Sequence, residues 1–244
     1  MKISIITVSF NSASTILETI NSVNDQSYKN IEHVFIDGLS TDNTLDIIKK
    51  KSSRNPLIIS EKDNGLYDAM NKGIKLATGN VIGILNSDDF FKNKLVIDKI
   101  VKEFKFSGSD IVYGNIDYVN KDGDIVRFWK SNKFKSFKKG WHPPHPSLFV
   151  KKTIYEKYGV FNTDFKIAAD FELMLRFFER HSVQSSYLND TIVTMLVGGV
   201  SNTFTGILKG RSEIKKAFKK NKISPSFFYI IQRYLPKLIK ILKK

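Results

Sequence analysis

Short runs of apolar, mostly β-branched residues alternate with stretches of helical periodicity over residues 1 to about 115. The expected strands are Ile3–Val8, Ile31–Ile36, Leu57–Ser60, Val81–Leu85 and Ile111–Gly114, and the expected helices cover 14–25, 41–50, 66–77 and 94–104. Strands that alternate with helices are joined by right-handed crossovers and form a mostly parallel sheet. The sequence therefore predicts an α/β fold with helices flanking a mostly parallel central sheet.

Polar and acidic residues directly follow four of these expected strands. They are Ser9-Phe10-Asn11, Asp37-Gly38, Glu61-Lys62-Asp63 and Ser87-Asp88-Asp89. Open parallel sheets bind ligands beyond the carboxyl ends of their strands, so we expect these residues to share one site. In "LNSDDF" (85–90), Asp88 and Asp89 are suited to hold Mg²⁺ or Mn²⁺, which take oxygen ligands. The alternative is a charged turn that only closes the strand.

After residue 115 the pattern changes. Asp117–Val119 and Ile125–Phe128 flank "NKDGD" (120–124), whose Asp-Gly pair predicts a β-hairpin. The following segment 127–140 holds six Lys or Arg residues and no acid, so it is either a lid, a contact for a lipid-linked diphosphate, or a solvated loop. Further on, the sequence predicts a strand over Ser147–Val150 and helices over Lys151–Tyr158 and Asp170–Arg180.

The net charge of +15 belongs mainly to the last 39 residues, 206–244, where twelve Lys or Arg residues face a single acid, Glu213. From Phe227 to Leu242 apolar residues recur at helical spacing with cations between them, interrupted by Pro236. A basic amphipathic helix of this kind can lie on an anionic membrane surface. It can instead pack on its own domain or on a second copy of the chain, so an oligomer stays open.

Composition places the protein among soluble globular proteins, with 41% hydrophobic and 26% charged residues. No apolar run approaches the ~20 residues that span a bilayer. The chain has no cysteine, which excludes disulfides and fits a reducing compartment. Because the opening residues are typical of a buried strand rather than a signal peptide, we expect a cytoplasmic protein.

Several motifs occur together in the order and spacing of family 2 glycosyltransferases, whose catalytic domain has the GT-A fold. They are "ITVSFNS" (6–12), "DGLSTDNT" (37–44), "SEKDNGLYDAMNKGIKLATGN" (60–80), "LNSDD" (85–89), "HPSLFVKK" (145–152), "IAADFELMLR" (167–176) and "GGVSN" (198–202). The third motif resembles a branch that builds bacterial surface polysaccharides such as O-antigen, capsule and colanic acid. The resemblance implies a Rossmann-like GT-A domain over 1–205, with a nucleotide-sugar half (about 1–115), an acceptor half (about 116–205) and a basic helical tail (206–244).

The same resemblance implies roles for residues of the nucleotide-sugar half. Nucleotide-sugar binding is expected of Thr7, Ser9, Asn11, Asp37, Asp63, Gly65, Asp68, Asn71, Lys72, Asn86 and Ser87. The family's usual metal motif is Asp, any residue, Asp, but here Asn86 replaces the first Asp. Metal binding therefore falls to Asp88, Asp89 or both. Related enzymes often carry an Arg near residues 62–75, where this chain offers only Lys62, Lys72 and Lys75.

In the acceptor half, Asp170 matches the family's general base, and Glu172 is the second choice. Small apolar neighbours, Ala168 and Ala169, would leave the Asp170 carboxylate partly desolvated, which suits a proton acceptor. The alternative is that Asp170 only caps the following helix. By resemblance His145 lies on the acceptor side, near the leaving diphosphate.

Taken together, the resemblance implies an inverting, metal-dependent glycosyltransferase that uses a nucleotide sugar, most often a UDP-sugar. Its acceptor would be a glycan linked to a polyprenyl diphosphate, at the inner face of the cell membrane. Two alternatives come from other classes. A nucleic-acid binder fits the charge but leaves the acidic strand ends unexplained, and we expect no nucleic-acid partner. A nucleotidyltransferase would need a glycine-rich basic loop after the first strand, which "SFNSAS" (9–14) lacks.

Overall fold

A computed structural model describes residues 1–197, 204–226 and 229 of the protein. The strands are β1 (Ile3–Ser9), β2 (Ile31–Asp37), β3 (Leu57–Ser60), β4 (Val81–Ile84), β5 (Asp89–Phe91), β6 (Ile111–Val119), β7 (Ile125–Trp129), β8 (Leu148–Lys151) and β9 (Ser185–Leu196). The α-helices are α1 (Ile16–Asn24), α2 (Thr44–Lys51), α3 (Leu66–Leu76), α4 (Val96–Ser107), α5 (Lys152–Tyr158), α6 (Ala169–Leu175) and α7 (Phe204–Lys220).

The strands form one sheet in the order β3-β2-β1-β4-β8-β6-β9-β5, with β7 paired to β6. Its first half is parallel, as predicted: β1 lies between β2 and β4, and β2 pairs with β3. In the register, Ser9 faces Asp37 and Asp37 faces Ser60. The carboxyl ends of these strands therefore lie at one edge of the sheet.

The second half of the sheet departs from the predicted parallel order. β8 lies antiparallel between β4 and β6, and β6 continues through residue 119 to form the hairpin with β7. Two strands were not predicted. β9 runs parallel to β6 although its sequence, "SSYLNDTIVTML", mixes polar and apolar residues, and β5 has three residues and begins at Asp89. Short or polar strands of this kind are held by their neighbours, so their own sequence carries little signal.

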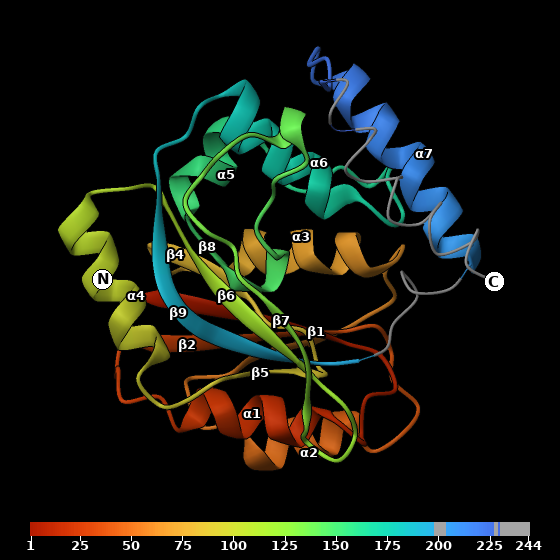
Figure 1. Ribbon diagram of the computed structural model, residues 1–244. Helices are drawn as coiled ribbons and strands as arrows, with labels where there is room; N and C mark the ends of the chain where they lie inside the picture. Colours follow the sequence, from red (N-terminus) through yellow and green to blue (C-terminus); the bar gives the residue numbers. More distant parts are fainter. Residues whose placement is uncertain (198–203, 227–228, 230–244) are drawn as a thin grey trace.

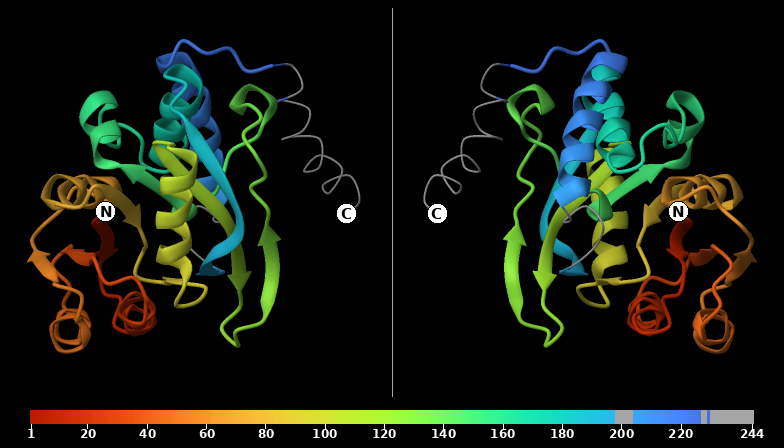
Figure 2. Two further views of the ribbon diagram at one scale, coloured as in Figure 1. Left: turned by 90° about the vertical axis from the view of Figure 1, so that its left-hand side faces the viewer. Right: turned by 90° about the vertical axis from the view of Figure 1, so that its right-hand side faces the viewer.

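Helices cover both faces of the sheet (Figure 1). α3, α6 and α7 bury apolar side chains against one face, including Ile6 and Val8 of β1, whereas α1 and α4 pack on the other, with Ile3 and Ile5. This division follows from the alternation of side chains along a strand. In Figure 2 the β6–β7 hairpin lies on the opposite side of the molecule from α1 and α2.

The predicted helix over 170–180 is divided. α6 ends at Leu175, and residues 176–180 form a π-helical turn. α7 packs on the domain: Ile214, Ala217 and Phe218 belong to the main core cluster. None of the helices in the described part of the chain has the length and apolar character that crossing a membrane requires. The motif at 198–202 and the amphipathic pattern over 227–242, except Tyr229, lie outside the described residues.

Candidate active site

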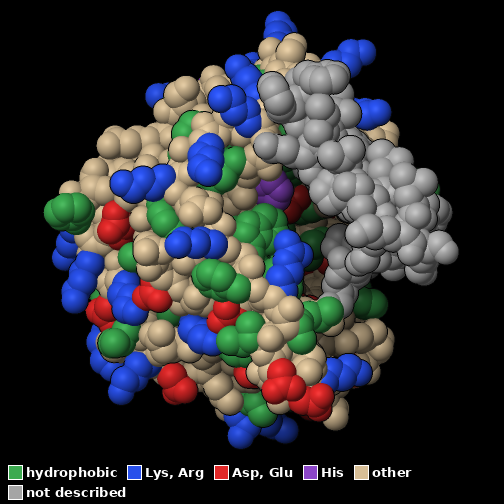
Figure 3. Space-filling view, in the orientation of Figure 1, with side chains coloured by type: hydrophobic (Ala, Val, Ile, Leu, Met, Phe, Trp, Pro, Cys, Tyr) green, Lys and Arg blue, Asp and Glu red, His purple; other side chains and the backbone are tan. Residues whose placement is uncertain are grey.

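A cavity of about 1030 Å³ opens at the edge of the sheet where β1, β2 and β4 end. Its walls come from α3, α6, the β6–β7 hairpin and the segment 142–146. On the face shown in Figure 3, a hollow contains histidine and acidic side chains. Residues from each of the four strand ends that the sequence singled out thus meet at one concave site, as expected for an open α/β sheet.

Eight of the sequence-predicted site residues line this cavity: Ser9, Asp63, Gly65, Asn86, Ser87, Asp88, His145 and Asp170. Gly38 also lines it and lies under Asp63, because a Cβ built at Gly38 would be 2.7 Å from Asp63 Oδ2. Asp63 in turn accepts a hydrogen bond from the Gly65 amide (2.8 Å). The turn after β3 is therefore packed directly on the turn after β2, and both present backbone to the cavity.

Asp37 lies behind this surface. Its side chain is fully buried and accepts hydrogen bonds from the hydroxyls of Ser9 (3.1 Å) and Ser60 (2.9 Å) and from the amide and hydroxyl of Ser40. These partners come from β1, β3 and the turn after β2. Asp37 does not line the cavity. Its hydrogen bonds hold together the carboxyl ends of β1, β2 and β3.

The two carboxylates of "LNSDDF" have different surroundings. Asp88 is exposed and lines the cavity, and partial desolvation by the surrounding protein raises its pKa. Asp89 is 1% exposed, begins β5 and accepts a hydrogen bond from the Asn86 side chain (2.9 Å). Burial, and secondly the charge of Asp88, raise the pKa of Asp89 well above its ordinary value. Of these two residues, Asp88 and not Asp89 therefore presents its carboxylate to a ligand in the cavity.

Asp170 is the second residue of α6 and also lines the cavity. The Tyr67 hydroxyl donates to the Ile167 carbonyl (2.9 Å) and lies 3.3 Å from Asp170 Oδ1. Burial and the charge of Asp170 raise the pKa of Tyr67, so the hydroxyl stays protonated and available as a donor. The residue before α6 that takes the capping position is Ala168, not Asp170. The capping alternative for Asp170 is therefore wrong.

His145 is buried beside these groups. Its ring packs edge-on against Phe161, with 5.3 Å between the centroids. Burial lowers the pKa of His145, and the nearby Asp170 charge opposes this shift only in part. A neutral imidazole is thus placed at the cavity wall near the Asp170 carboxylate.

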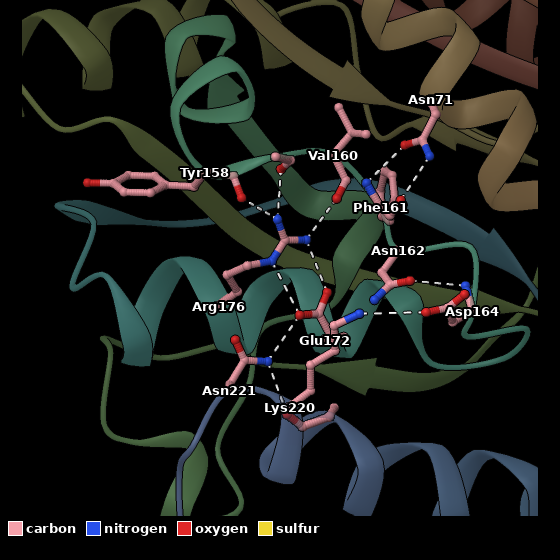
Figure 4. Close-up of polar contacts among 12 residues, drawn as sticks. Asn71, Tyr158, Val160, Phe161, Asn162, Asp164, Glu172, Arg176, Lys220 and Asn221 are labelled. Carbon is pink, nitrogen blue, oxygen red and sulfur yellow. Dashed lines mark hydrogen bonds and ion pairs between the residues drawn. The ribbon is translucent and has the colours of Figure 1, made fainter.

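Glu172 does not line the cavity, and its carboxylate points toward Arg176 and Asn221 (Figure 4). It is 2% exposed, pairs with Arg176 (Oε2 to Nη2, 3.0 Å) and accepts a hydrogen bond from Asn221 (3.0 Å). Arg176 donates in turn to the backbone carbonyls of residues 158–160. Glu172 is committed to this buried network, so the geometry leaves Asp170 as the carboxylate of α6 at the site.

Three further residues that were predicted to bind the nucleotide sugar do not line the cavity, and their side chains are bonded to other parts of the protein: Thr7, Asn11 and Asn71. Thr7 is buried, with its hydroxyl 2.9 Å from His33 Nε2. Asn11 accepts from the Thr41 amide (2.9 Å). The Asn71 side chain exchanges two hydrogen bonds of 2.9 Å with the backbone of Phe161.

Asp68 and Lys72 form a local group on α3. Asp68 accepts from the Asn64 amide (2.9 Å), and Lys72 pairs with Glu61 (2.8 Å), which raises the Lys72 pKa. Two other lysines, Lys62 and Lys166, line the cavity instead. Lys62 was one of the three lysines weighed from the sequence, but Lys166 was missed, as was Tyr67. The sequence feature that could have indicated a role for Lys166 at the site is its position four residues before Asp170.

The residues at the cavity fit a hard divalent cation of the Mg²⁺ or Mn²⁺ type. Within the residues that the structure describes, no group of three or more His, Cys, Asp or Glu could hold a metal ion by itself. Such cations, however, usually take one or two protein carboxylates together with substrate phosphates. Asp88 supplies one carboxylate, and the buried Asn86 Oδ1 beside it has no hydrogen-bond partner among the described residues. Both are oxygen ligands of the appropriate kind.

Comparison with protein families gives a match over two thirds of the chain. The model described as glycosyl transferase family 2 matches residues 4–167. The chain is 30% identical over 238 residues to the UDP-Glc:alpha-D-GlcNAc-diphosphoundecaprenol beta-1,3-glucosyltransferase WfaP of Escherichia coli, with 94% of this chain and 92% of that protein covered.

Two solved structures share the fold. TarS 1–349 of S. aureus in complex with UDP-GlcNAc matches with a TM-score of 0.68 at 18% identity, covering 91% of this chain and 65% of that one. The chain thus spans slightly less than two thirds of that TarS structure. The mannosyltransferase PcManGT of Pyrobaculum calidifontis, in complex with GDP-Man and Mn²⁺, matches with a TM-score of 0.64 at 17% identity, covering 96% and 69%.

Proposed function

The chain belongs to glycosyl transferase family 2, and we propose that it transfers a sugar, with inversion, from a nucleotide sugar to a glycan acceptor. One observation carries the proposal: Asp88 and Asp170 line the same cavity of about 1030 Å³. We assign the Asp88 carboxylate to the donor diphosphate and the Asp170 carboxylate to the acceptor hydroxyl. Family membership favours sugar transfer over the nucleotidyltransferase and nucleic-acid alternatives.

We assign the donor to the side of the cavity formed by the ends of β1, β2 and β4. Ser9 and the backbone around Gly38 and Gly65 border the space for the nucleoside, and Asn86 and Ser87 border the sugar and ribose. Lys62 and Lys166 are the lysines at the cavity, and we assign them to the diphosphate. A UDP-sugar is favoured, because the relative WfaP is named for UDP-Glc and the TarS structure holds UDP-GlcNAc.

Asp170 is the proposed general base. The Tyr67 hydroxyl contacts Asp170 Oδ1 and so orients the carboxylate. We assign the other oxygen, Oδ2, to the acceptor hydroxyl. As Asp170 takes the proton, the acceptor oxygen forms a bond to the anomeric carbon, and the bond from that carbon to the diphosphate oxygen breaks on the opposite face. The nucleoside diphosphate carries away the bonding electrons. Attack from one face and departure from the other inverts the anomeric centre.

We assign a divalent cation to Asp88, with Asn86 beside it. When bound, Mn²⁺ or Mg²⁺ supplies positive charge to the departing diphosphate. PcManGT, which shares the fold, was solved with Mn²⁺. The buried Asp89 carboxylate accepts a hydrogen bond from the Asn86 side chain and so stabilises the turn over residues 86–89.

The proposed acceptor is a glycan on a polyprenyl diphosphate, as the name of WfaP implies for that enzyme. His145 lines the cavity, as does Trp129 of the basic segment 127–140. We assign this part of the cavity to the acceptor. Exposed lysines of α7 and the basic residues beyond it would hold the protein peripherally at the anionic inner face of the cell membrane. A homo-oligomer formed through the tail is the alternative use of these residues.

A thermal-shift panel of UDP-, GDP- and dTDP-sugars, each with and without Mn²⁺, tests the proposal. A ligand that binds only the folded state stabilises it by about 2.7 kcal/mol at a concentration of about 100 times Kd. We expect UDP-sugars to raise Tm, and to raise it further with Mn²⁺. The control is the Asp88→Asn variant, in which the Mn²⁺-dependent part should disappear. If no nucleotide sugar shifts Tm, the proposed function is wrong.

A further inference from the structure

Glu213 of α7 is a buried carboxylate that the proposed mechanism does not use. It is 7% exposed and accepts hydrogen bonds from three consecutive backbone amides, those of Lys166 (2.9 Å), Ile167 (2.8 Å) and Ala168 (2.9 Å). We propose that Glu213 is a positioning residue that sets the orientation of Asp170. This inference rests on the proposed function, because it assigns Asp170 the role of general base.

Glu213 holds the backbone that leads into α6. This helix begins at Ala169, and its N-cap residue, Ala168, has no side chain that can accept a hydrogen bond. The amide of an N-cap residue needs an acceptor from elsewhere, and negative charge at the start of a helix is favourable to the helix dipole. Glu213, from a different helix, accepts from the Ala168 amide and from the two amides before it, and it brings its negative charge to the start of α6. Without it, these three amides would lose their acceptor.

The segment held by Glu213 belongs to the cavity wall. Lys166 and Ile167 line the cavity, and the Ile167 carbonyl accepts the Tyr67 hydroxyl that also contacts Asp170. Glu213 lies close enough that its charge also helps to raise the Tyr67 pKa. Fixing the backbone of this segment therefore fixes both the Tyr67 partner and the start of the helical turn that carries Asp170.

Positioning of the segment 166–168 is distinct from simple attachment of α7. The residue that directly follows this helix makes a second, independent contact with α6, in which Asn221 donates to Glu172 (3.0 Å; Figure 4). In addition, Phe218 packs on Phe171, with 5.7 Å between the ring centroids. Substitution of Glu213 should therefore leave α7 docked, whereas substitution of Asn221 should weaken docking without touching the amides of residues 166–168. The two variants form a matched pair.

The test is steady-state sugar transfer by the full chain, comparing Glu213→Ala, Glu213→Gln and the control Asn221→Ala at a temperature below the melting point of each. Misplacement of a catalytic group by about 1 Å costs on the order of 10²-fold in rate. We expect Glu213→Ala to lower kcat by ~10- to 100-fold, with the donor KM within about threefold of its original value. Glu213→Gln, which keeps one acceptor oxygen, should recover part of the rate. Asn221→Ala should keep kcat within about threefold.

Three results would overturn the inference. They are full kcat in Glu213→Ala, equal losses of kcat in Glu213→Ala and Asn221→Ala, and a loss in Glu213→Ala that resides in the donor KM alone. The wild-type protein separates this inference from the proposal beneath it. If the wild type transfers sugar and Glu213→Ala does so equally well, only the role of Glu213 is refuted. If the wild type transfers no sugar from any nucleotide donor, the proposed function and this inference both fail.

Discussion

The burial of His33 predicts how the free energy of unfolding depends on pH. Its ring is fully buried in β2, with Nε2 2.9 Å from the Thr7 hydroxyl and Nδ1 without a hydrogen-bond partner among the described residues. Burial lowers the pKa of His33 from 6.5 to about 3. The proposed perturbation is His33→Gln, because an amide can keep the hydrogen bond to Thr7 but does not titrate.

The sign and size follow from proton linkage. Between the two pKa values the unfolded chain binds a proton that the folded chain does not, so the free energy of unfolding falls as the pH drops from 6.5 towards 3. At about 1.36 kcal/mol per pKa unit, the full effect is about 5 kcal/mol. Between about pH 7.5 and about pH 5, the expected loss from this one group is about 2 kcal/mol.

The assay is urea denaturation of the wild type and of His33→Gln at both pH values. Other titrating groups are common to the two proteins. One is Glu32, whose pKa is lowered to about 2 mainly by hydrogen bonds that outweigh its burial, so its contribution is lost only below about pH 4.5. The difference in unfolding free energy between the two proteins should therefore shrink by about 2 kcal/mol on acidification. Parallel losses in both proteins would refute the argument that His33 is buried in its neutral form.

Three further predictions concern particular contacts. Glu172→Gln leaves Arg176 without its buried counter-charge and should lower the free energy of unfolding by ~3–5 kcal/mol in urea titration, and a loss below about 1 kcal/mol would contradict the buried ion pair. Gly83→Ala places a Cβ 2.5 Å from the Phe149 ring and should cost ~1–3 kcal/mol in thermal unfolding, so an unchanged Tm would speak against this close packing of β4 on β8. Asp88→Asn should abolish Mn²⁺-dependent transfer, whereas Asp89→Asn should retain most of it. The opposite ranking in a Mn²⁺ titration would move the metal to Asp89.

Much of the fold could be predicted from sequence where the physical signal is local. The four parallel strands are β-branched runs that end in polar residues, and the structure confirms their positions. β9 could not be found in this way. It pairs with β6 near both of its ends, with register shifts between, and this pairing, rather than an alternating pattern of its own, places its polar residues in the sheet. β5, with three residues, is too short to carry a periodic signal.

The candidate site shows the same limit. Strand order alone brought Ser9 and Asp88 to one cavity, because both follow parallel strands. Thr7 was expected there as well, but it lies two residues earlier in β1, where His33 covers it. Glu213 was counted only as the single acid of a basic tail. Its partner Ile167 is 46 residues away in the chain, and no local pattern reports a contact of that separation.

The central claim is that Asp170 deprotonates the acceptor at the cavity formed by the strand ends. The most direct test is the rate of sugar transfer by Asp170→Asn, measured together with the affinity for the nucleotide sugar. Removal of a general base costs ~10²–10⁴-fold in rate. We therefore predict a loss of kcat in that range, with donor affinity within about threefold of the wild type. Full transfer activity in Asp170→Asn would contradict the account.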